Sequence, residues 1–364
     1  MGVRVAVVGL GVMGACTLWR LSARGVPAAG FERWQPGHDQ GASHGETRII
    51  RTAYYEGADY VPLVQASFGL WRELQAASDQ SLLTMTGALM IGSPESELVS
   101  GALRSAREHG LAHELLAAAA VERRYPQHRL RLGEVALYEQ DAGVLRPEAC
   151  VRAAVELAER LGAEVHAGHA APSLEELRES FDHVVVCAGA WLPKLAPYLR
   201  IEVERQAMTW FQPRDVAMFR PGRFPVFMRE TPAGGDRFGI PAVEGDLVKV
   251  GIHHEGETTD ADHIDRSIRA DDLRPIEEFV AGALNGLEPR VVKAKICMYS
   301  NTADRHFLVG PVPGFDGVTV LGGFSGHGFK FAPVLGEVAA ELATEGRTRY
   351  PIELFSPARA LTRA

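Results

Sequence analysis

The chain alternates between short β-branched apolar runs and longer stretches with helical spacing. The run VRVAVV at residues 3–8 is typical of a buried strand and leads directly into GLGVMG. CTLWRLSARG follows with leucines at helical spacing and a stop at Gly25, and residues 26–31 predict a second strand that ends beside Glu32. The pattern therefore predicts a strand, a glycine turn, a helix, a second strand and an acid, in that order.

Two later segments repeat the strand-to-turn pattern. Residues 143–168 predict a helix that starts near Pro147, and FDHVVVCAGAW then places a buried strand at 184–187 before a turn of small residues. Nearer the C-terminus, a strand at 318–321 precedes a turn with four glycines and a helix through 335–342. Such turns let a backbone approach a ligand closely, so we expect separated pieces of one domain to hold one extended dinucleotide.

The segments between these stretches show a different pattern of turn residues and apolar runs. Residues 224–254 show Gly, Pro and Asp turns between short apolar runs, which predicts antiparallel hairpins. The expected fold class is thus α/β plus α+β, with a Rossmann-like dinucleotide-binding domain assembled from discontinuous segments and an antiparallel-sheet substrate domain. The predicted domains are 1–81, 139–203 and 297–364 for dinucleotide binding, and 82–138 and 204–296 for the substrate domain.

The first glycine turn carries a recognisable chemistry. Gly9, Gly11 and Gly14 form GxGxxG, and Glu32 lies 23 residues after Gly9. In this motif the first glycine permits a tight turn, the second lets the backbone reach a pyrophosphate at a helix N-terminus, and the third allows close helix packing. An acid at this spacing hydrogen-bonds an adenosine ribose, which favours FAD or NAD over NADP. The alternative is a purely structural glycine turn.

Composition and charge exclude several classes. The net charge of -8 and the absence of any Lys/Arg run argue against nucleic acid or an anionic membrane as the main partner. The four cysteines are far apart, without metal-ligand spacing, so we expect no metal site and no disulfide framework. No leader-like segment or long apolar run is evident, and we expect a cytoplasmic protein.

The segment GASHGETRIIRTAYYE contains two arginines, Arg48 and Arg51, around an Ile-Ile pair. Residues three apart share one face of a helical turn, so the pair is expected to lie together. One interpretation is a solvated pair on a surface helix, because arginine is mostly exposed. The other is the wall of an anion-binding pocket.

With these stretches placed, the chain resembles the monomeric sarcosine oxidase and N-methyltryptophan oxidase family of flavoprotein amine oxidases over nearly its whole length. The resemblance rests on GLGVMG with Glu32, SHGETRIIRTAYYEG, KICMYSNTADRHF and GGFSGHGFKF. It implies FAD attached covalently through a cysteine thioether, and Cys297 in KICMY occupies the matching position. As an isolated residue, Cys297 would be interpreted as a small buried hydrophobe.

The resemblance also implies roles for four cationic side chains. Arg51 and Lys330 match residues that bind the substrate carboxylate, and Arg48 matches an arginine near the flavin ring. A guanidinium suits such a site because its planar fork meets a carboxylate through two charge-assisted hydrogen bonds. Lys249 matches a lysine that lies over the flavin and assists reaction with O2, where a cation stabilises developing negative charge. Taken alone, Lys249 could equally project outward from a hairpin strand.

Further residues follow from the same resemblance. His253 matches a histidine of the substrate pocket, Tyr299 a nearby tyrosine, and His44 a histidine beside the flavin, whereas His254 is interpreted as structural. The loop around His327 is expected to contact the flavin through backbone amides. The complete set of expected cofactor-binding residues is Gly9, Gly11, Gly14, Glu32, Arg33, Ser43, Cys297, Gly326, His327, Gly328 and Lys330.

One position departs from the family pattern. Sarcosine-oxidising members carry a tyrosine at the position matched by Phe238, and this difference changes the polarity of the pocket, so the resemblance does not identify the amine substrate. The resemblance implies oxidation of a small secondary or cyclic amino acid by hydride transfer to FAD, with O2 as acceptor and imine and hydrogen peroxide as products. The family name implies a monomer. Two alternatives remain: a dehydrogenase that uses another acceptor, and a noncatalytic dinucleotide-binding protein.

Overall fold

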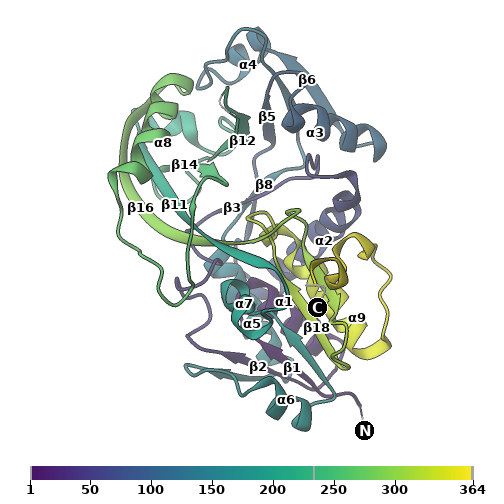
Figure 1. The fold of residues 1–364 in the computed structure, drawn as a ribbon. Coiled ribbons are helices and arrows are strands. Elements are labelled where there is room, and N and C mark those ends of the chain that lie inside the picture. The colour runs from purple at the N-terminus through teal and green to yellow at the C-terminus, as the bar shows by residue number, and fades with distance from the viewer. Residues whose placement is uncertain (1, 233, 362–364) are drawn as a thin grey trace.

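The computed structural model describes residues 2–232 and 234–361 and has two lobes, each built on a large sheet (Figure 1). The first sheet has six strands in the order β17-β18-β10-β1-β2-β9. Only β17 runs antiparallel to its neighbour; the other pairs are parallel. In that order the bounds are Leu308–Pro311, Val318–Gly322, His183–Val186, Val5–Val8, Ala28–Glu32 and Glu164–Ala167.

These strands confirm the dinucleotide-binding half of the predicted fold class, with shifted ends. The expected strand at residues 3–8 is shorter, and the expected strand at 26–31 begins and ends later. The reason is pairing: Val5 lies opposite Ala28 and Val8 opposite Phe31, so the shared ladder sets the ends of both strands. The pieces come from three separated stretches of chain, as predicted.

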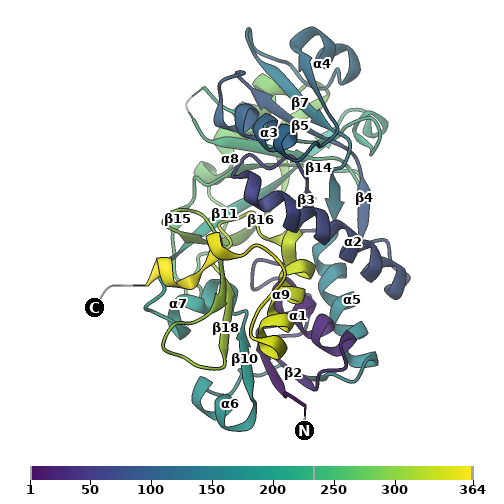
Figure 2. The same cartoon turned by 90° about the vertical axis from the view of Figure 1, so that its right-hand side faces the viewer.

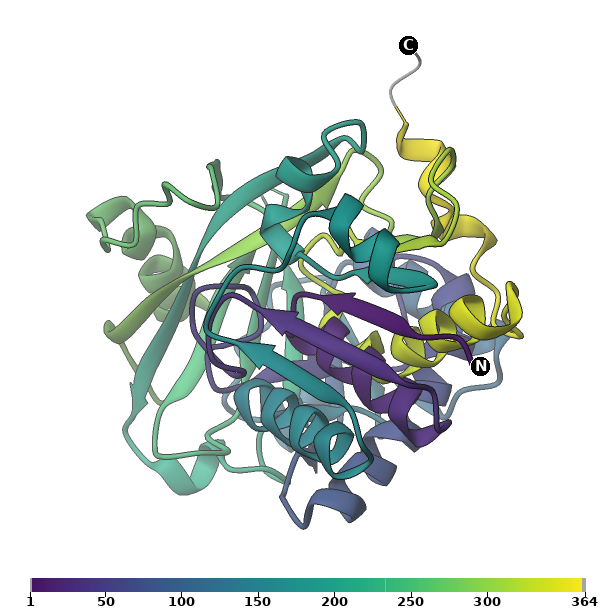
Figure 3. The same cartoon turned by 90° about the horizontal axis from the view of Figure 1, so that it is seen from below.

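Helices cover both faces of this sheet. On one face lie α1 (Val12–Ala23), α5 (Pro147–Arg160) and α9 (Ala332–Glu345), which Figure 2 shows beside one another. On the other face lie α6 (Leu174–Ser180) and α7 (Leu192–Leu195), and the view from below in Figure 3 shows helices on both sides of the strands. Strand alternation explains the division, because Val5 and Val7 pack with α1 and α9 whereas Ala6 packs with α6 and α7.

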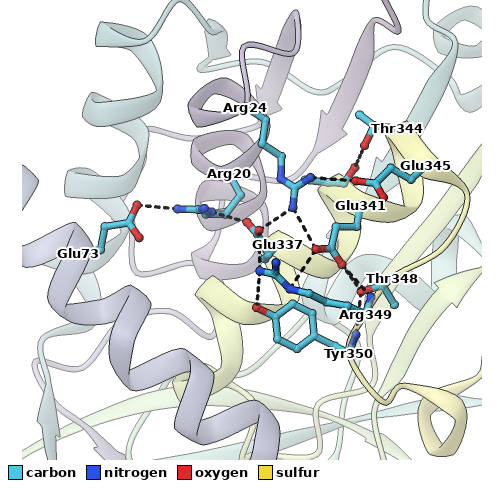
Figure 4. Close-up of polar contacts among 11 residues, drawn as sticks. Arg20, Arg24, Glu73, Glu337, Glu341, Thr344, Glu345, Thr348, Arg349 and Tyr350 are labelled. Carbon is cyan, nitrogen blue, oxygen red and sulfur yellow. Dashed lines mark hydrogen bonds and ion pairs between the residues drawn. The ribbon is translucent and has the colours of Figure 1, made fainter.

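An ion-pair network locks α1 to α9 (Figure 4). Glu337 on α9 accepts hydrogen bonds from Arg20 Nε at 2.6 Å and from Arg24 Nη2 at 2.6 Å. Arg24 also reaches Glu341 at 3.1 Å, and Arg20 reaches Glu73 on α2 (Val61–Ser78) at 2.7 Å. Burial alone would raise the pKa of Glu337, but its hydrogen bonds to Arg24 and Arg20 outweigh burial and lower it. Because α1 begins at the glycine turn, the network also fixes that turn.

The second sheet confirms the predicted antiparallel hairpins. Its order is β15-β11-β14-β13-β12-β5-β7-β6, with β16 paired to β11. The hairpins within 224–254 are β12, β13 and β14, and one parallel pair, β5 with β12, interrupts the antiparallel pattern. The bounds are Glu257–Thr258, Ile201–Pro213, Val248–His253, Asp236–Ile240, Val226–Glu230, Ala88–Gly92, Val135–Glu139 and His113–Ala117 in that order, and Leu287–Thr302 for β16.

Three helices pack on the second sheet. They are α3 (Glu97–Glu108), α4 (Ala118–Arg124) and α8 (Ala270–Ala283). A third, small sheet between the lobes has the order β3-β8-β4, with bounds Arg48–Ile50, Gly143–Leu145 and Leu83–Met85. The short 3-10 helices are η1 Ala58–Tyr60, η2 Gly189–Trp191, η3 Val216–Phe219, η4 Phe329–Phe331, η5 Glu353–Phe355 and η6 Pro357–Ala360.

Two long strands, β11 and β16, join the lobes through one continuous ladder (Figure 1). The predicted boundary between 296 and 297 falls inside β16. The domain boundaries themselves stay a prediction. Within the described part of the chain, no helix is both long and apolar enough to cross a membrane.

Candidate active site

A cavity of about 530 Å³ follows the carboxyl ends of the parallel strands. Its lining includes eight residues expected to bind the cofactor, which are Gly9, Gly11, Glu32, Arg33, Ser43, Cys297, Gly326 and Gly328. Three other expected residues, Gly14, His327 and Lys330, are not part of this lining. All three glycine turns predicted from the sequence contribute backbone to this one cavity.

The first glycine turn has the geometry that its motif predicts. Gly9 has φ +88°, and a Cβ on it would lie 2.6 Å from the carbonyl oxygen of Cys187. A Cβ on Gly14 would lie 1.8 Å from the carbonyl oxygen of Gly9, so Gly14 serves packing rather than ligand contact. Gly11 faces the cavity at the start of α1, where Val12 N–H donates to Ser43 Oγ at 3.0 Å.

Glu32 ends β2 at the edge of the cavity. Its carboxylate accepts hydrogen bonds from Leu10 N–H at 2.8 Å and from Trp34 N–H at 3.1 Å. Burial alone would raise the pKa of Glu32, but hydrogen bonds from His38 and these two amides outweigh burial and lower it. The carboxylate is therefore ionised and fixed beside the turn, as a ribose-binding acid requires.

A second, smaller cavity of about 90 Å³ adjoins the first. The two cavities share five lining residues, which are Arg48, Cys297, Tyr299, Gly326 and Phe329. The small cavity also contains Arg51, Lys249, His253 and Lys330, so four cationic side chains surround a space suited to a small anion. The structure therefore brings the expected catalytic residues to one place, His44 excepted.

Arg48 and Arg51 do not share a helical turn, and that prediction is wrong. Arg48 belongs to β3 and Arg51 follows it directly. In an extended segment, residues three apart point to opposite sides, so the two guanidinium groups separate. Arg48 lies with Nη2 3.7 Å from Cys297 Sγ, whereas Arg51 is only 2% exposed and stacks 4.3 Å from the Tyr54 ring centre. The surface-helix alternative is excluded for Arg51.

Arg51 already has a carboxylate partner within the chain. Its Nη2 donates to both carboxylate oxygens of Glu56, at 2.7 and 2.6 Å, and its Nη1 donates to the carbonyl oxygen of Ala53 at 3.1 Å. Burial alone would lower the pKa of Arg51, but Glu56 outweighs burial and raises it. A ligand carboxylate in this cavity must therefore share Arg51 with Glu56 or rely on another cation.

Lys330, in η4, is that second cation. Its Nζ donates to the carbonyl oxygen of His327 at 2.6 Å and to Tyr54 Oη at 3.2 Å. An ammonium has three N–H donors, so one is left for a ligand. Burial, followed by the positive charge of Arg51, lowers the pKa of Lys330 to about 7.

Lys249 also lines the small cavity and belongs to β14. It is 3% exposed, and its Nζ donates to the carbonyl oxygens of Gly45 at 3.0 Å and Thr47 at 3.3 Å. Burial, followed by the positive charge of Arg48, lowers the pKa of Lys249 well below its ordinary value. The outward-facing alternative for this lysine is therefore wrong.

Two histidines near the cavities are neutral. His253 Nδ1 lies 3.2 Å from Tyr299 Oη, and burial lowers the pKa of His253 well below its ordinary value. Burial lowers the pKa of His44 to about 3, with Arg48 and Lys249 contributing next. His44 lines neither cavity, and no residue described in the structure hydrogen-bonds its buried ring nitrogens.

Phe238 supplies part of the apolar wall of the small cavity. It projects from β13, and its ring fills the space over Gly251, where an added Cβ would lie 2.5 Å from Phe238 Cζ. Met228, Ile240 and Ile252 continue this wall. The side of the cavity away from Arg51 and Lys330 thus offers apolar contacts where a tyrosine would have offered a hydroxyl.

Comparison with known families decides the class of the chain. The model of the FAD dependent oxidoreductase family named DAO matches residues 4–342. The chain belongs to this family. Within it, the chain is 40% identical to the monomeric sarcosine oxidase of Streptomyces avermitilis, over 98% of this chain and 97% of the relative. It is also 32% identical to the N-methyl-L-tryptophan oxidase of Salmonella arizonae, over 97% of this chain and 98% of the relative. The resemblance seen in the sequence is confirmed.

Solved structures confirm the fold of this FAD-dependent oxidoreductase. NikD, an unusual amino acid oxidase essential for nikkomycin biosynthesis, superimposes with a TM-score of 0.82 at 22% identity, covering 98% of this chain and 97% of NikD. L-proline dehydrogenase from P. horikoshii superimposes with a TM-score of 0.84 at 20% identity, covering 100% and 99% of the two chains.

The residues present fit FAD. Gly11 opens the helix N-terminus toward the large cavity, and an added Cβ would approach only Ser43 Oγ, at 3.3 Å. An ionised Glu32 stands at one part of the lining and Cys297 at another, where the large cavity meets the small one. The described residues contain no group of three His, Cys, Asp or Glu side chains that could hold a metal ion.

Sequence reasoning missed several residues of the site. Glu56 ends the segment GASHGETRIIRTAYYE, but nothing in the sequence indicates that its carboxylate would bind the Arg51 guanidinium. Tyr54 contacts Lys330 and Arg51, but no pattern in the sequence marks it as a residue of the site. Glu204 and Gln206 lie in β11, where only strand pairing reveals their neighbours. The strand also contains Glu202, Arg205, Thr209 and Gln212, so its sequence does not single out Glu204 and Gln206.

Proposed function

We propose that this FAD-dependent oxidoreductase oxidises the CH–NH bond of a small secondary or cyclic amino acid, with O2 as acceptor and imine and hydrogen peroxide as products. The observation that carries the proposal is the junction of a dinucleotide cavity with a small cavity that holds Arg51 and Lys330. When bound, FAD supplies the two-electron acceptor and is reoxidised by O2. The chain itself supplies binding, orientation and charge.

The small cavity orients the substrate through two kinds of contact. Lys330, with its remaining N–H, and Arg51 bind the carboxylate, while the apolar wall at Phe238 and Ile252 receives the carbon substituents. Holding the reacting C–H in one place in this way is worth several kcal/mol of the barrier, about 7–11 kcal/mol in the most favourable cases. A pocket of about 90 Å³ limits the substrate to a small amino acid.

Lys249 serves the reaction with O2 in this proposal. Its ammonium is buried close to Arg48, in the lining of the small cavity. A cation at a water-excluded position stabilises negative charge that develops during electron transfer to O2. Its low pKa confines this charged form to lower pH than for an ordinary lysine.

We propose also that Cys297 carries FAD through a thioether. Cys297 is 2% exposed, lies at the junction of the two cavities, and has Arg48 Nη2 3.7 Å from its sulfur. All four cysteines are free thiols in the structure, so Cys297 is available for such a bond.

The protein is proposed to act as a cytoplasmic monomer. Support comes from its similarity to proteins named monomeric sarcosine oxidase and from its buried free thiols, which are usual in reducing compartments. Light scattering of the purified protein tests the monomer, and a mass of two or more chains would contradict it.

An amine screen with paired readouts tests the proposed reaction. The purified yellow protein is mixed anaerobically with N-methyl and cyclic amino acids, and bleaching of the flavin absorbance is followed. Air is then admitted, and oxygen consumption and peroxide are measured. Bleaching followed by stoichiometric peroxide is expected. Bleaching without oxygen uptake would instead identify a dehydrogenase with another acceptor, and no bleaching by any secondary amino acid would refute the proposed substrate class.

A further inference from the structure

The middle of the β16-β11-β14 ribbon forms one side of the small cavity. Gln206 on β11 pairs with Cys297 on β16, and Glu204 pairs with Tyr299. On the other side of β11, Met208 pairs with Gly251 on β14, the strand that ends at His253, and Gln206, Cys297 and His253 all line the small cavity. Gln206 therefore lies between the cysteine at the cavity junction and the histidine of the small cavity.

Glu204, next to Gln206 on the same face of β11, is a buried carboxylate with three donors. It is 6% exposed and accepts hydrogen bonds from Gln206 Nε2, from Gly256 N–H at 2.7 Å and from Asn301 Nδ2. Burial alone would raise the pKa of Glu204, but the nearby His254 ring, with Nδ1 3.8 Å from the carboxylate, and hydrogen bonds from Gly256 and Asn301 outweigh burial and lower it. The group is therefore an ionised carboxylate at neutral pH.

An ionised carboxylate fixes the orientation of the Gln206 amide. A carboxylate has only acceptors, so the NH2 side of the amide must face Glu204 and the oxygen must face away. Among residues 2–232 and 234–361, no donor hydrogen-bonds Gln206 Oε1, and this oxygen is not one of the fully buried atoms without a partner, so it keeps exposed surface. Because Gln206 is 5% exposed and lines the small cavity, this oxygen is the polar atom that it presents there.

Acceptors are scarce in the small cavity. Arg48 and Arg51 are donors only, Lys249 and Lys330 are donors only while they are protonated, and both oxygens of Glu56 accept from Arg51. An amino acid needs acceptors as well as donors, because its amino N–H groups must exchange water for protein partners. An oriented amide oxygen beside His253 meets that need.

We propose that Gln206 Oε1 accepts a hydrogen bond from the amino N–H of the bound substrate, and that Glu204 is the positioning residue that holds the amide in this orientation. The inference rests on the proposed function, since it assumes an amino acid in the small cavity. It adds a second recognition point to the carboxylate site: the carboxylate meets Lys330 and Arg51, and the nitrogen meets Gln206.

Two ring acids of the same shape test the assignment. Pyrrole-2-carboxylate carries an N–H beside its carboxylate, and furan-2-carboxylate carries an oxygen at the same position. Their dissociation constants are measured by calorimetry on the holoenzyme and on Gln206→Met, which removes the acceptor and keeps the length of the side chain. The wild-type protein should prefer the pyrrole acid by roughly 3- to 10-fold, as expected for one hydrogen bond, and Gln206→Met should abolish the preference by weakening only the pyrrole acid.

Two further variants separate orientation from packing. Glu204→Gln gives the Gln206 amide a partner that can donate or accept, so the preference for the pyrrole acid should fall. Gln212→Met changes the same residue type at an exposed position of the same strand, and should leave both dissociation constants unchanged. Flavin content and thermal unfolding are compared across all variants.

The outcomes distinguish the possible failures. If both acids bind the wild-type protein and the preference survives in Gln206→Met, or both acids weaken equally, Gln206 does not bind the amine and the inference is overturned. If neither acid binds the wild-type protein, the proposed function fails and the inference with it. Selective loss of the pyrrole preference in Gln206→Met supports both.

Discussion

The low pKa of Lys330 makes a quantitative prediction about substrate binding. Lys330 must be protonated to bind a carboxylate, and burial with Arg51 places its pKa at about 7, against 10.5 for an ordinary lysine. A bound carboxylate adds the negative charge that the site otherwise takes only from Glu56, so it raises this pKa again. Binding should therefore be coupled to proton uptake, and affinity should fall as pH rises through the pKa of the free protein.

The size of the effect follows from linkage. Each pH unit between the pKa values of the free and bound forms is worth about 1.4 kcal/mol. If the bound carboxylate raises the pKa of Lys330 to about 9 or above, the dissociation constant should increase roughly 50- to 100-fold between about pH 6 and about pH 9. Arg51 adds nothing to the pH dependence of the dissociation constant, because Glu56 raises the pKa of Arg51 above the ordinary value and the guanidinium stays charged over this pH range.

The assay uses furan-2-carboxylate, because this ligand has no amine whose own titration would interfere. Calorimetry across the pH range gives the dissociation constant, and repeating it in buffers of different ionisation enthalpy counts the protons taken up. Lys330→Met should bind weakly and without a slope. Lys293→Met, which changes a lysine outside both cavities, should retain the wild-type slope.

A flat pH profile without proton uptake would refute this reasoning, because it would mean that Lys330 is either always charged or not in contact with the carboxylate. A slope that persists in Lys330→Met would assign the titration to another group. In either case the pH dependence of binding could not be assigned to Lys330.

Three further predictions concern the cofactor and the fold. In Cys297→Ser, acid precipitation should release the flavin to the supernatant, whereas the wild-type pellet should keep it; release from both would contradict a covalent bond at Cys297. Lys249→Met should slow reoxidation by O2 about 100-fold or more in stopped-flow experiments, with little change in anaerobic reduction, because one preorganised charge is lost. Rates of reduction and reoxidation that both equal those of the wild-type protein would contradict the role of Lys249. Glu337→Gln should lower the free energy of unfolding by about 3–5 kcal/mol in urea, because Arg20 and Arg24 lose a buried partner, and should leave ligand affinity unchanged.

Local pattern was enough to predict the dinucleotide-binding half of the fold. The glycine turn and the acid at the end of β2 belong to one short stretch of chain, and Gly14 packs against the backbone of Gly9 within the same turn. The hairpins β12 to β14 were predictable for the same reason, since turn residues and strand alternation lie close together in sequence. The parallel pairing of β5 with β12 joins distant segments and had no local signal.

The error at Arg48 and Arg51 has a physical cause. Spacing of three fits a helical turn, but the Ile-Ile pair between them is β-branched, and β3 pairs with β8 almost a hundred residues later. Tertiary pairing overrides local spacing in so short a segment. The extended backbone then sends Arg48 toward Cys297 and Arg51 toward Glu56, which is how one segment supplies both cavities.

Register in the β11-β16 ladder ties the proposed attachment of the cofactor to the proposed recognition of the substrate. The pairing runs without irregularity from Ile201 opposite Thr302 to Trp210 opposite Lys293, and the shifts begin only beyond Trp210. A slip of one residue would turn every side chain to the other face of the ribbon. If either strand slipped, Cys297 or Gln206 would leave the cavities while the other stayed, so the uninterrupted register is what gives one ribbon both tasks.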